Sequence, residues 1–119
     1  MTTLDLEHAR LVFRLAKSGL DICRDLTPEG ANLLHMAVGV SGEAGELLDA
    51  VKKHVIYNKP IDRVNVIEEL GDLSFYEEGI RQALGITREE VLAANMEKLS
   101  RRYHLGRYSD QQAARRADK

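Results

Sequence analysis

The sequence predicts an all-α fold of four antiparallel helices. Apolar residues recur at helical spacing in four stretches, and no stretch alternates in the manner of a strand. The two prolines, Pro28 and Pro60, fall in short breaks between stretches, and short connections favour antiparallel neighbours. Because four short helices make a thin core, we expect the bundle to be completed by oligomerisation, as a homodimer or homotetramer.

The first two expected helices cover residues 5–23 and 31–55. The first has Leu11, Leu15 and Ile22 among its apolar positions. In the second, the apolar residues fall in one narrow stripe: Leu33, Ala37, Val40, Ala44, Leu47, Leu48, Val51 and Val55. So regular a stripe indicates that this face is buried.

The third and fourth helices are expected over residues 62–84 and from Thr87 to about Tyr103. The third has a stripe of Val66, Leu70, Leu73, Ile80 and Leu84. Glu77 interrupts this stripe, and either pairs across a subunit interface or borders a site. Thr87-Arg88-Glu89-Glu90 forms a capping box that begins the fourth helix. We expect the charged tail from about residue 106 to be ordered only against a partner subunit.

The composition indicates one globular domain spanning residues 1–119, with 44% hydrophobic and 30% charged residues. The formal net charge of −2 gives no general attraction to nucleic acid or anionic lipid, although the C-terminal end is locally basic. We therefore expect neither a nucleic-acid nor a membrane partner. The lone Cys23 forms no internal disulfide, and neither a signal peptide nor a membrane span is visible, so a cytoplasmic location is expected.

Two pairs of acids are the strongest functional feature. Glu43 and Glu46 stand three residues apart on the second helix, as do Glu69 and Asp72 on the third, so each pair shares a helix face. If the two helices are antiparallel, the pairs converge and the four carboxylates repel one another. A hard divalent cation, Mg²⁺ or alternatively Mn²⁺, relieves that repulsion and prefers an all-oxygen ligand set. A di-iron centre is disfavoured, because the required Glu-x-x-His pairs are missing.

The neighbourhood of the first pair also suggests a ligand site. Gly39, Gly42 and Gly45 lie near the side of the acids, and each glycine inside a helix costs about 1 kcal/mol relative to alanine. We infer that something approaches this backbone closely. His35 and Lys53 project on the side of Glu46 and are candidate substrate ligands, Lys53 for a phosphate. A solvated lysine at a helix end explains Lys53 equally simply.

The ordered motifs resemble those of the MazG-type all-α nucleoside triphosphate pyrophosphohydrolases, over roughly residues 30 to 118. The matching segments are Glu43-Ala44-Gly45-Glu46, Glu69-Leu70-Gly71-Asp72 and Asn95-Met96-Glu97-Lys98-Leu99-Ser100-Arg101-Arg102-Tyr103. The chain is most similar in type to the compact single-domain members found in bacteria and phages. The resemblance implies a MazG-like fold.

The resemblance also implies a Mg²⁺-dependent hydrolase that converts a (deoxy)nucleoside triphosphate to a monophosphate and pyrophosphate. Its implied metal ligands are Glu43, Glu46, Glu69 and Asp72, with Glu46 or Glu43 as the catalytic base. Asn95, Lys98 and Arg102, which share one face of the fourth helix, would meet phosphate or sugar. Candidates for stacking on the base are His35, Phe75 and Tyr76.

Two alternatives remain open from the sequence. Within enzymes, the nearest alternative is a phosphoribosyl-ATP pyrophosphohydrolase or a dUTP- or dCTP-specific member of the same superfamily. All of these cut the same kind of bond, and they differ in the pocket that selects the base. A different class is a non-catalytic helical interaction module whose acids form a structural cation site. The Asn95–Lys98 segment argues against the module, because a scaffold needs no phosphate-binding groups.

Overall fold

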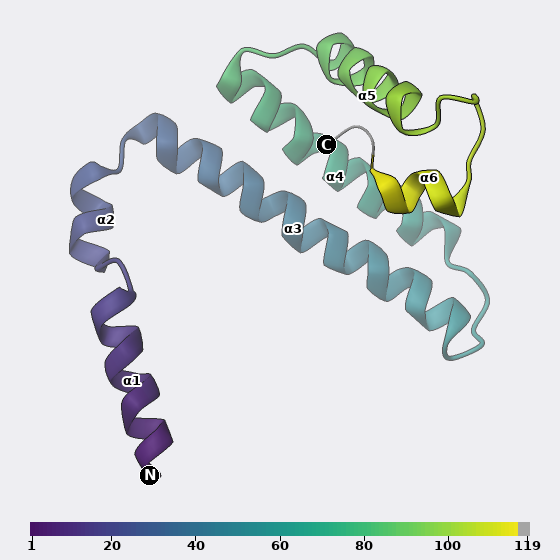
Figure 1. Ribbon diagram of the computed structural model, residues 1–119. Coiled ribbons are helices and arrows are strands. Elements are labelled where there is room, and N and C mark those ends of the chain that lie inside the picture. The colour runs from purple at the N-terminus through teal and green to yellow at the C-terminus, as the bar shows by residue number, and fades with distance from the viewer. Residues whose placement is uncertain (117–119) are drawn as a thin grey trace. The chain divides into compact units, whose positions relative to one another are not determined.

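The computed structural model describes residues 1–116, and every regular element in that range is a helix. The elements are α1 (Thr3–Leu15), α2 (Gly19–Asp25), α3 (Pro28–Val55), α4 (Arg63–Leu84), α5 (Arg88–Arg102) and α6 (Asp110–Arg115) (Figure 1). The predicted all-α class is confirmed. Within the described residues, no helix is both long enough and apolar enough to cross a membrane.

The chain divides into two compact units, residues 1–31 and residues 32–119. In the first unit, the prediction of one helix over residues 5–23 is wrong. The backbone becomes extended at Ala16, and α2 begins after Ser18, whose hydroxyl oxygen accepts a hydrogen bond from the Asp21 N–H at 3.1 Å. Ser18 is a favourable N-cap, so its own helix start competes with continuation of α1.

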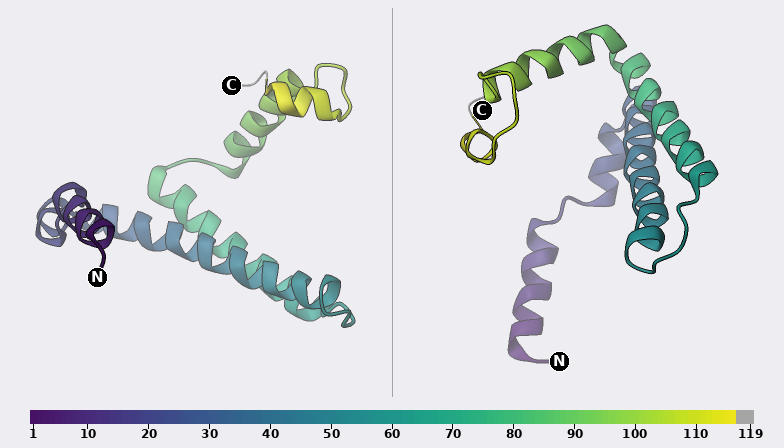
Figure 2. Two further views of the ribbon diagram at one scale, coloured as in Figure 1. Left: turned by 60° about the horizontal axis from the view of Figure 1, so that its bottom comes forward. Right: turned by 90° about the vertical axis from the view of Figure 1, so that its right-hand side faces the viewer.

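In the second unit, α3 and α4 lie side by side in both views of Figure 2. Their contact is made by large side chains set against glycine. The Tyr76 ring of α4 covers Gly39 of α3, and the Met36 side chain of α3 covers Gly79 of α4, so neither glycine has room for a Cβ. Because the higher-numbered residue of α3 pairs with the lower-numbered residue of α4, the helices are antiparallel, as predicted.

The connection between α3 and α4 is fixed by local hydrogen bonds. His54 Nδ1 donates to the Lys59 carbonyl oxygen at 2.7 Å, and the Lys59 N–H donates to the carbonyl of Lys53 at 3.3 Å. The Asp62 carboxylate then accepts from the Asn65 N–H at 3.0 Å and caps α4. These bonds hold the hairpin that aligns the two acidic motifs.

The core of this single chain is thin. Among the described residues, Ala50 is the only buried hydrophobic side chain. The prediction that the whole α3 stripe is buried is wrong for the chain alone, since Leu48 and Val55 are 67% and 61% exposed. The face of α3 that meets α4 includes Met36 and Gly39, so α4 covers only one edge of the stripe. Glu77, the interruption in the α4 stripe, is exposed.

The predicted capping box at the start of α5 is confirmed: the Thr87 hydroxyl accepts from the Glu90 N–H, and the Glu90 carboxylate accepts from the Thr87 N–H. α6 begins after Ser109, which caps it in the same way, and packs against α5. Residues 110–115 of the charged tail are therefore helical in the single chain. Residues 117–119 of that tail lie outside the described residues.

Candidate functional site

Three carboxylates meet where α3 faces α4. Glu43 of α3 and Glu69 and Asp72 of α4 each offer an oxygen atom, and these oxygens all lie within 4.8 Å of one another. Glu43 and Glu69 are half-buried, whereas Asp72 is exposed. The convergence follows from the antiparallel hairpin, because the two acidic motifs stand at the same level of the paired helices.

The electrostatics of this cluster penalise ionisation. Partial burial raises the pKa of Glu69, a hydrogen bond with the Glu43 side chain raises it further, and the negative charges of Glu43, Glu46 and Asp72 act in the same direction. Without a counter-ion, the raised pKa of Glu69 limits this repulsion by favouring its protonated form. A divalent cation does the same more completely, and an all-oxygen donor set fits a hard ion.

Glu46 lies next to this cluster but is not one of its three members. Its side chain is exposed, one turn along α3 from Glu43. Its charge nevertheless contributes to the raised pKa of Glu69 and to that of Lys53, so it belongs to the same electrostatic environment. Of the four carboxylates in the two acidic motifs, Glu46 is thus the one that is exposed and outside the cluster.

The glycines beside the acids serve two different purposes. Gly42 and Gly45 on α3 and Gly71 on α4 have no heavy atom within 4 Å of a Cβ position, so the helix surface there is open. Gly39, by contrast, is filled by the Tyr76 ring. The inference that something approaches this backbone closely is therefore confirmed at Gly39, where the Tyr76 ring does so, whereas no such neighbour is present among the described residues at Gly42 or Gly45.

An aromatic cluster adjoins the covered glycine, one helical turn from Glu43. The His35 ring meets the Tyr76 ring edge to face at 6.2 Å between centroids, and Phe75 meets Tyr76 at 5.1 Å. Phe75 is 65% exposed. These are the three rings that the sequence offers for stacking on a base, and the structure brings them together.

Lys53 is held by a residue that the sequence analysis did not consider. Its Nζ lies 2.9 Å from Asp49 Oδ2, and this contact raises the pKa of Lys53 and lowers that of Asp49. The sequence spacing predicts this ion pair, because Asp49 stands four residues before Lys53 on the same helix face. Both side chains remain largely exposed, so the ion pair is weak and exchangeable.

The remaining predicted ligands are on α5. Asn95 is exposed, and Lys98 and Arg102 are half-buried. Their spacing places them on one face of the helix.

Comparison with known protein families gives a match that covers most of this unit. The MazG nucleotide pyrophosphohydrolase domain matches residues 32–105, which include both acidic motifs and all of α5. No curated protein and no solved structure matches the chain. Since the match extends over more than half of the sequence, the chain belongs to the family of MazG nucleotide pyrophosphohydrolase domains.

Proposed function

We propose that this chain is a Mg²⁺-dependent hydrolase that converts a ribo- or deoxyribonucleoside triphosphate to the monophosphate and pyrophosphate. The observation that carries the proposal is the convergence of Glu43, Glu69 and Asp72 within a domain of the MazG family. Oxygens so close together, one of them on a carboxyl with a raised pKa, form a site that gains stability when a cation enters.

Glu43, Glu46, Glu69 and Asp72 would hold the cation, with Mg²⁺ as the first choice and Mn²⁺ as the second. When bound, such an ion supplies positive charge that neutralises phosphate oxygens and the departing pyrophosphate. Glu43 and Glu69 already face each other across the helix pair, so they need little rearrangement to become ligands.

Glu46 is the better of the two candidates for the general base. Hydrolysis forms a bond between a water oxygen and the α-phosphorus, breaks the bond from that phosphorus to the α–β bridging oxygen, and releases a proton from the water. Glu43 is engaged by Glu69, whereas Glu46 is exposed and outside the three-oxygen cluster. A carboxylate in that position can accept the proton without giving up a contact inside the protein.

The cationic and polar groups divide between the two ends of the substrate. Lys98 and Arg102 would bind phosphate oxygens, and Asn95 would bind phosphate or sugar. Lys53 would exchange its exposed pairing with Asp49 for a phosphate oxygen. His35 belongs to the aromatic cluster with Phe75 and Tyr76, which lies where a nucleobase could stack beside the open glycine surface.

We also infer that a second copy of this chain covers the exposed apolar face of α3 and α4, giving a homodimer or homotetramer. A groove of about 290 Å³ opens on this face, and its lining is mostly apolar: Val51, Ile61, Arg63, Val66, Ile67 and Leu70. Ile67 and Leu70 are 65% and 49% exposed, and continue the exposed stripe of α3. Contiguous apolar surface of this kind is typical of an interface.

The deciding experiment is a product analysis. The full chain is incubated with each common ribo- and deoxyribonucleoside triphosphate and Mg²⁺, and products are separated by anion exchange. Monophosphate plus pyrophosphate, abolished by a chelator, supports the proposal and identifies the preferred base. Diphosphate plus orthophosphate contradicts the assigned bond. If no nucleotide reacts, phosphoribosyl-ATP is the next substrate, and a protein that is stabilised by Mg²⁺ but inert towards both is an interaction module.

A further inference from the structure

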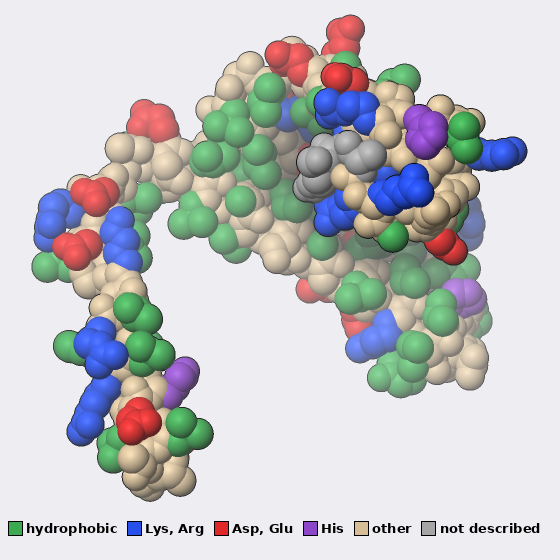
Figure 3. Space-filling view, in the orientation of Figure 1, with side chains coloured by type: hydrophobic (Ala, Val, Ile, Leu, Met, Phe, Trp, Pro, Cys, Tyr) green, Lys and Arg blue, Asp and Glu red, His purple; other side chains and the backbone are tan. Residues whose placement is uncertain are grey.

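The overall charge conceals a strongly basic region. Residues 98–116 contain six Lys and Arg residues but a single acid, Asp110, a formal net charge of +5 in a chain whose total is −2. The six are Lys98, Arg101, Arg102, Arg107, Arg115 and Arg116. Figure 3 shows Lys and Arg side chains gathered over the α5–α6 part of the molecule. An anionic partner is therefore attracted locally, even though the whole chain is acidic.

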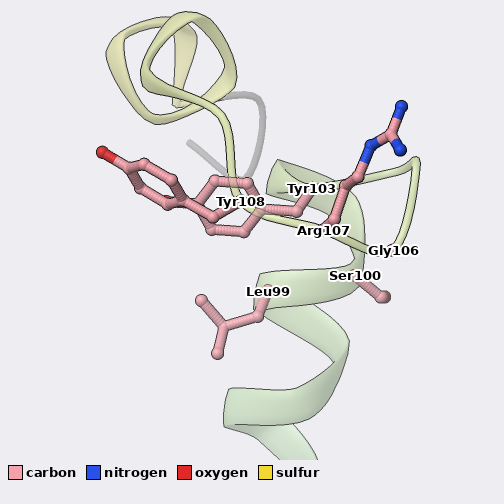
Figure 4. Close-up of a pocket in the computed structure, with 6 residues that line it drawn as sticks. All are labelled: Leu99, Ser100, Tyr103, Gly106, Arg107 and Tyr108. Atoms are coloured by element: carbon pink, nitrogen blue, oxygen red, sulfur yellow. The ribbon is translucent and has the colours of Figure 1, made fainter.

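A pocket of about 320 Å³ lies in this basic region, at the C-terminal end of α5. Its lining residues are Leu99, Ser100, Tyr103, Gly106, Arg107 and Tyr108 (Figure 4). The chain reverses at Gly106, whose φ of 74° is costly for other residues. That turn brings the Tyr108 ring beside the Tyr103 ring, with 5.6 Å between centroids and a tilt of 42°. Figure 4 shows both rings above Leu99, while the Arg107 guanidinium extends from the other side.

Tyr108 is the distinctive residue of this pocket. Its hydroxyl donates to an Asp110 carboxylate oxygen, which fixes the ring, and yet 68% of the residue is exposed. Asp110 is also the only acid in the basic region. The Tyr108 ring is thus a fixed and exposed aromatic face in a basic region, and Arg107 is the cationic residue that lines the same pocket. Proteins combine such a face with cationic side chains to stack a nucleobase while holding its phosphate.

We propose that this pocket is a nucleotide-binding site, distinct from the carboxylate cluster of α3 and α4. A nucleobase stacks on Tyr108, and the adjoining phosphate binds the Arg107 guanidinium. The ligand is either a free nucleotide or one unit of a single-stranded nucleic acid, because both present a base next to a phosphate. None of the residues that line the pocket belongs to the carboxylate cluster, although Lys98 and Arg102, which we propose above as substrate ligands, also contribute to the charge of the basic region.

The test is a binding measurement on the full chain, with a chelator present to prevent turnover. Fluorescence anisotropy reports binding of a labelled short oligodeoxythymidylate. Tyr108→Ala and Arg107→Ala should each weaken binding about tenfold, whereas Tyr108→Phe should retain it. The matched controls are Phe13→Ala, which removes an exposed ring outside the region, and Arg14→Ala, which removes a charge outside it. Circular dichroism verifies that each variant is folded.

Competition separates the two sources of ligand. If thymidine monophosphate displaces the oligonucleotide at concentrations near those at which it binds alone, the site takes free nucleotides. If only longer strands compete, and affinity falls with salt, the site takes a strand. Inorganic polyphosphate competing as well as the oligonucleotide, with Tyr108→Ala unchanged, would show charge attraction alone and overturn the proposal. Absence of binding by either ligand overturns it as well.

Discussion

Glu43 of α3 and Glu69 of α4 come from different acidic motifs, yet each has a carboxylate oxygen within 4.8 Å of the other, and this neighbourhood raises the pKa of Glu69. Two ionised carboxylates at this separation repel each other strongly. This pair therefore marks a place where the protein without a cation carries more negative charge than it can easily accommodate.

Glu69→Gln should stabilise the protein in the absence of metal and abolish its response to Mg²⁺. The substitution removes one of the repelling charges and keeps a group that can donate a hydrogen bond to Glu43. Thermal unfolding with a chelator and with excess Mg²⁺ measures both effects. Glu68→Gln is the matched control, because Glu68 is the exposed neighbour outside the cluster. A Mg²⁺-induced rise in Tm that is equal in the two variants would show that the ion binds elsewhere.

The stability of the metal-free protein should fall as the pH rises through the titration of Glu69. In the folded state the pKa of Glu69 lies above its ordinary value of 4.5. Below that ordinary value Glu69 is protonated in both the folded and the unfolded state, so it does not lower the free energy of unfolding. Above the folded pKa it is ionised in both states, and it then lowers the free energy of unfolding by the full amount. The Tm difference between Glu69→Gln and the natural protein, measured with a chelator, should be small near pH 4 and larger at pH 7. A difference that shrinks as pH rises has the wrong sign for this explanation.

Glu46→Gln should fold normally but lose turnover. Loss of a general base typically lowers the rate by about 10² to 10⁴-fold, and here an amide replaces the only carboxylate of the two motifs that is outside the three-oxygen cluster. Single-turnover rates at saturating Mg²⁺ separate this effect from weaker metal binding. If Glu43→Gln loses the chemical step while Glu46→Gln keeps it, the roles of the two residues are exchanged.

The sequence was sufficient for the features that depend on local spacing. The Thr87 capping box, the antiparallel α3–α4 pair and the level at which the two acidic motifs meet all follow from residues a few positions apart and from a short connection. The Ser18 N-cap is also a local feature. The apolar pattern continues on both sides of it, however, and so predicts a single unbroken helix. The break between α1 and α2 could therefore have been predicted by giving more weight to the cap.

Other features depend on tertiary contacts that periodicity does not encode. The sequence contains no indication that Gly39 receives the Tyr76 ring while Gly42 stays open, because the two glycines differ only in which part of α4 lies opposite. The rotation of α3 about its axis decides this, and it also leaves Leu48 and Val55 exposed. The Tyr103–Tyr108 pocket depends on a reversal at Gly106, which helix patterns do not predict.

Gly39→Ala should destabilise the protein, whereas Gly42→Ala should not. A methyl group at Gly39 meets the Tyr76 ring, and overpacking of this kind costs about 1–3 kcal/mol. At Gly42 the methyl group enters open space, so alanine should raise the free energy of unfolding by about 0.5–1 kcal/mol because its helix propensity is higher than that of glycine. Urea unfolding measures both changes. If a substrate approaches the open surface, Gly42→Ala should also raise KM although the protein is more stable. Equal stability of the two variants would contradict the observed contact.

Ile67→Lys should dissociate the proposed oligomer. Ile67 lines the apolar groove on α3 and α4, and is 65% exposed in the single chain. Burying an unpaired ammonium group in an interface costs far more than leaving it in water, so a subunit that covers the groove should be expelled. Light scattering coupled to size exclusion measures the mass. Glu68→Lys is the control, because it adds a lysine at the adjacent exposed position without touching the groove. If the natural protein already has the mass of one chain, or if both variants keep the natural mass, the groove is not the interface and the exposed stripe of α3 has another partner.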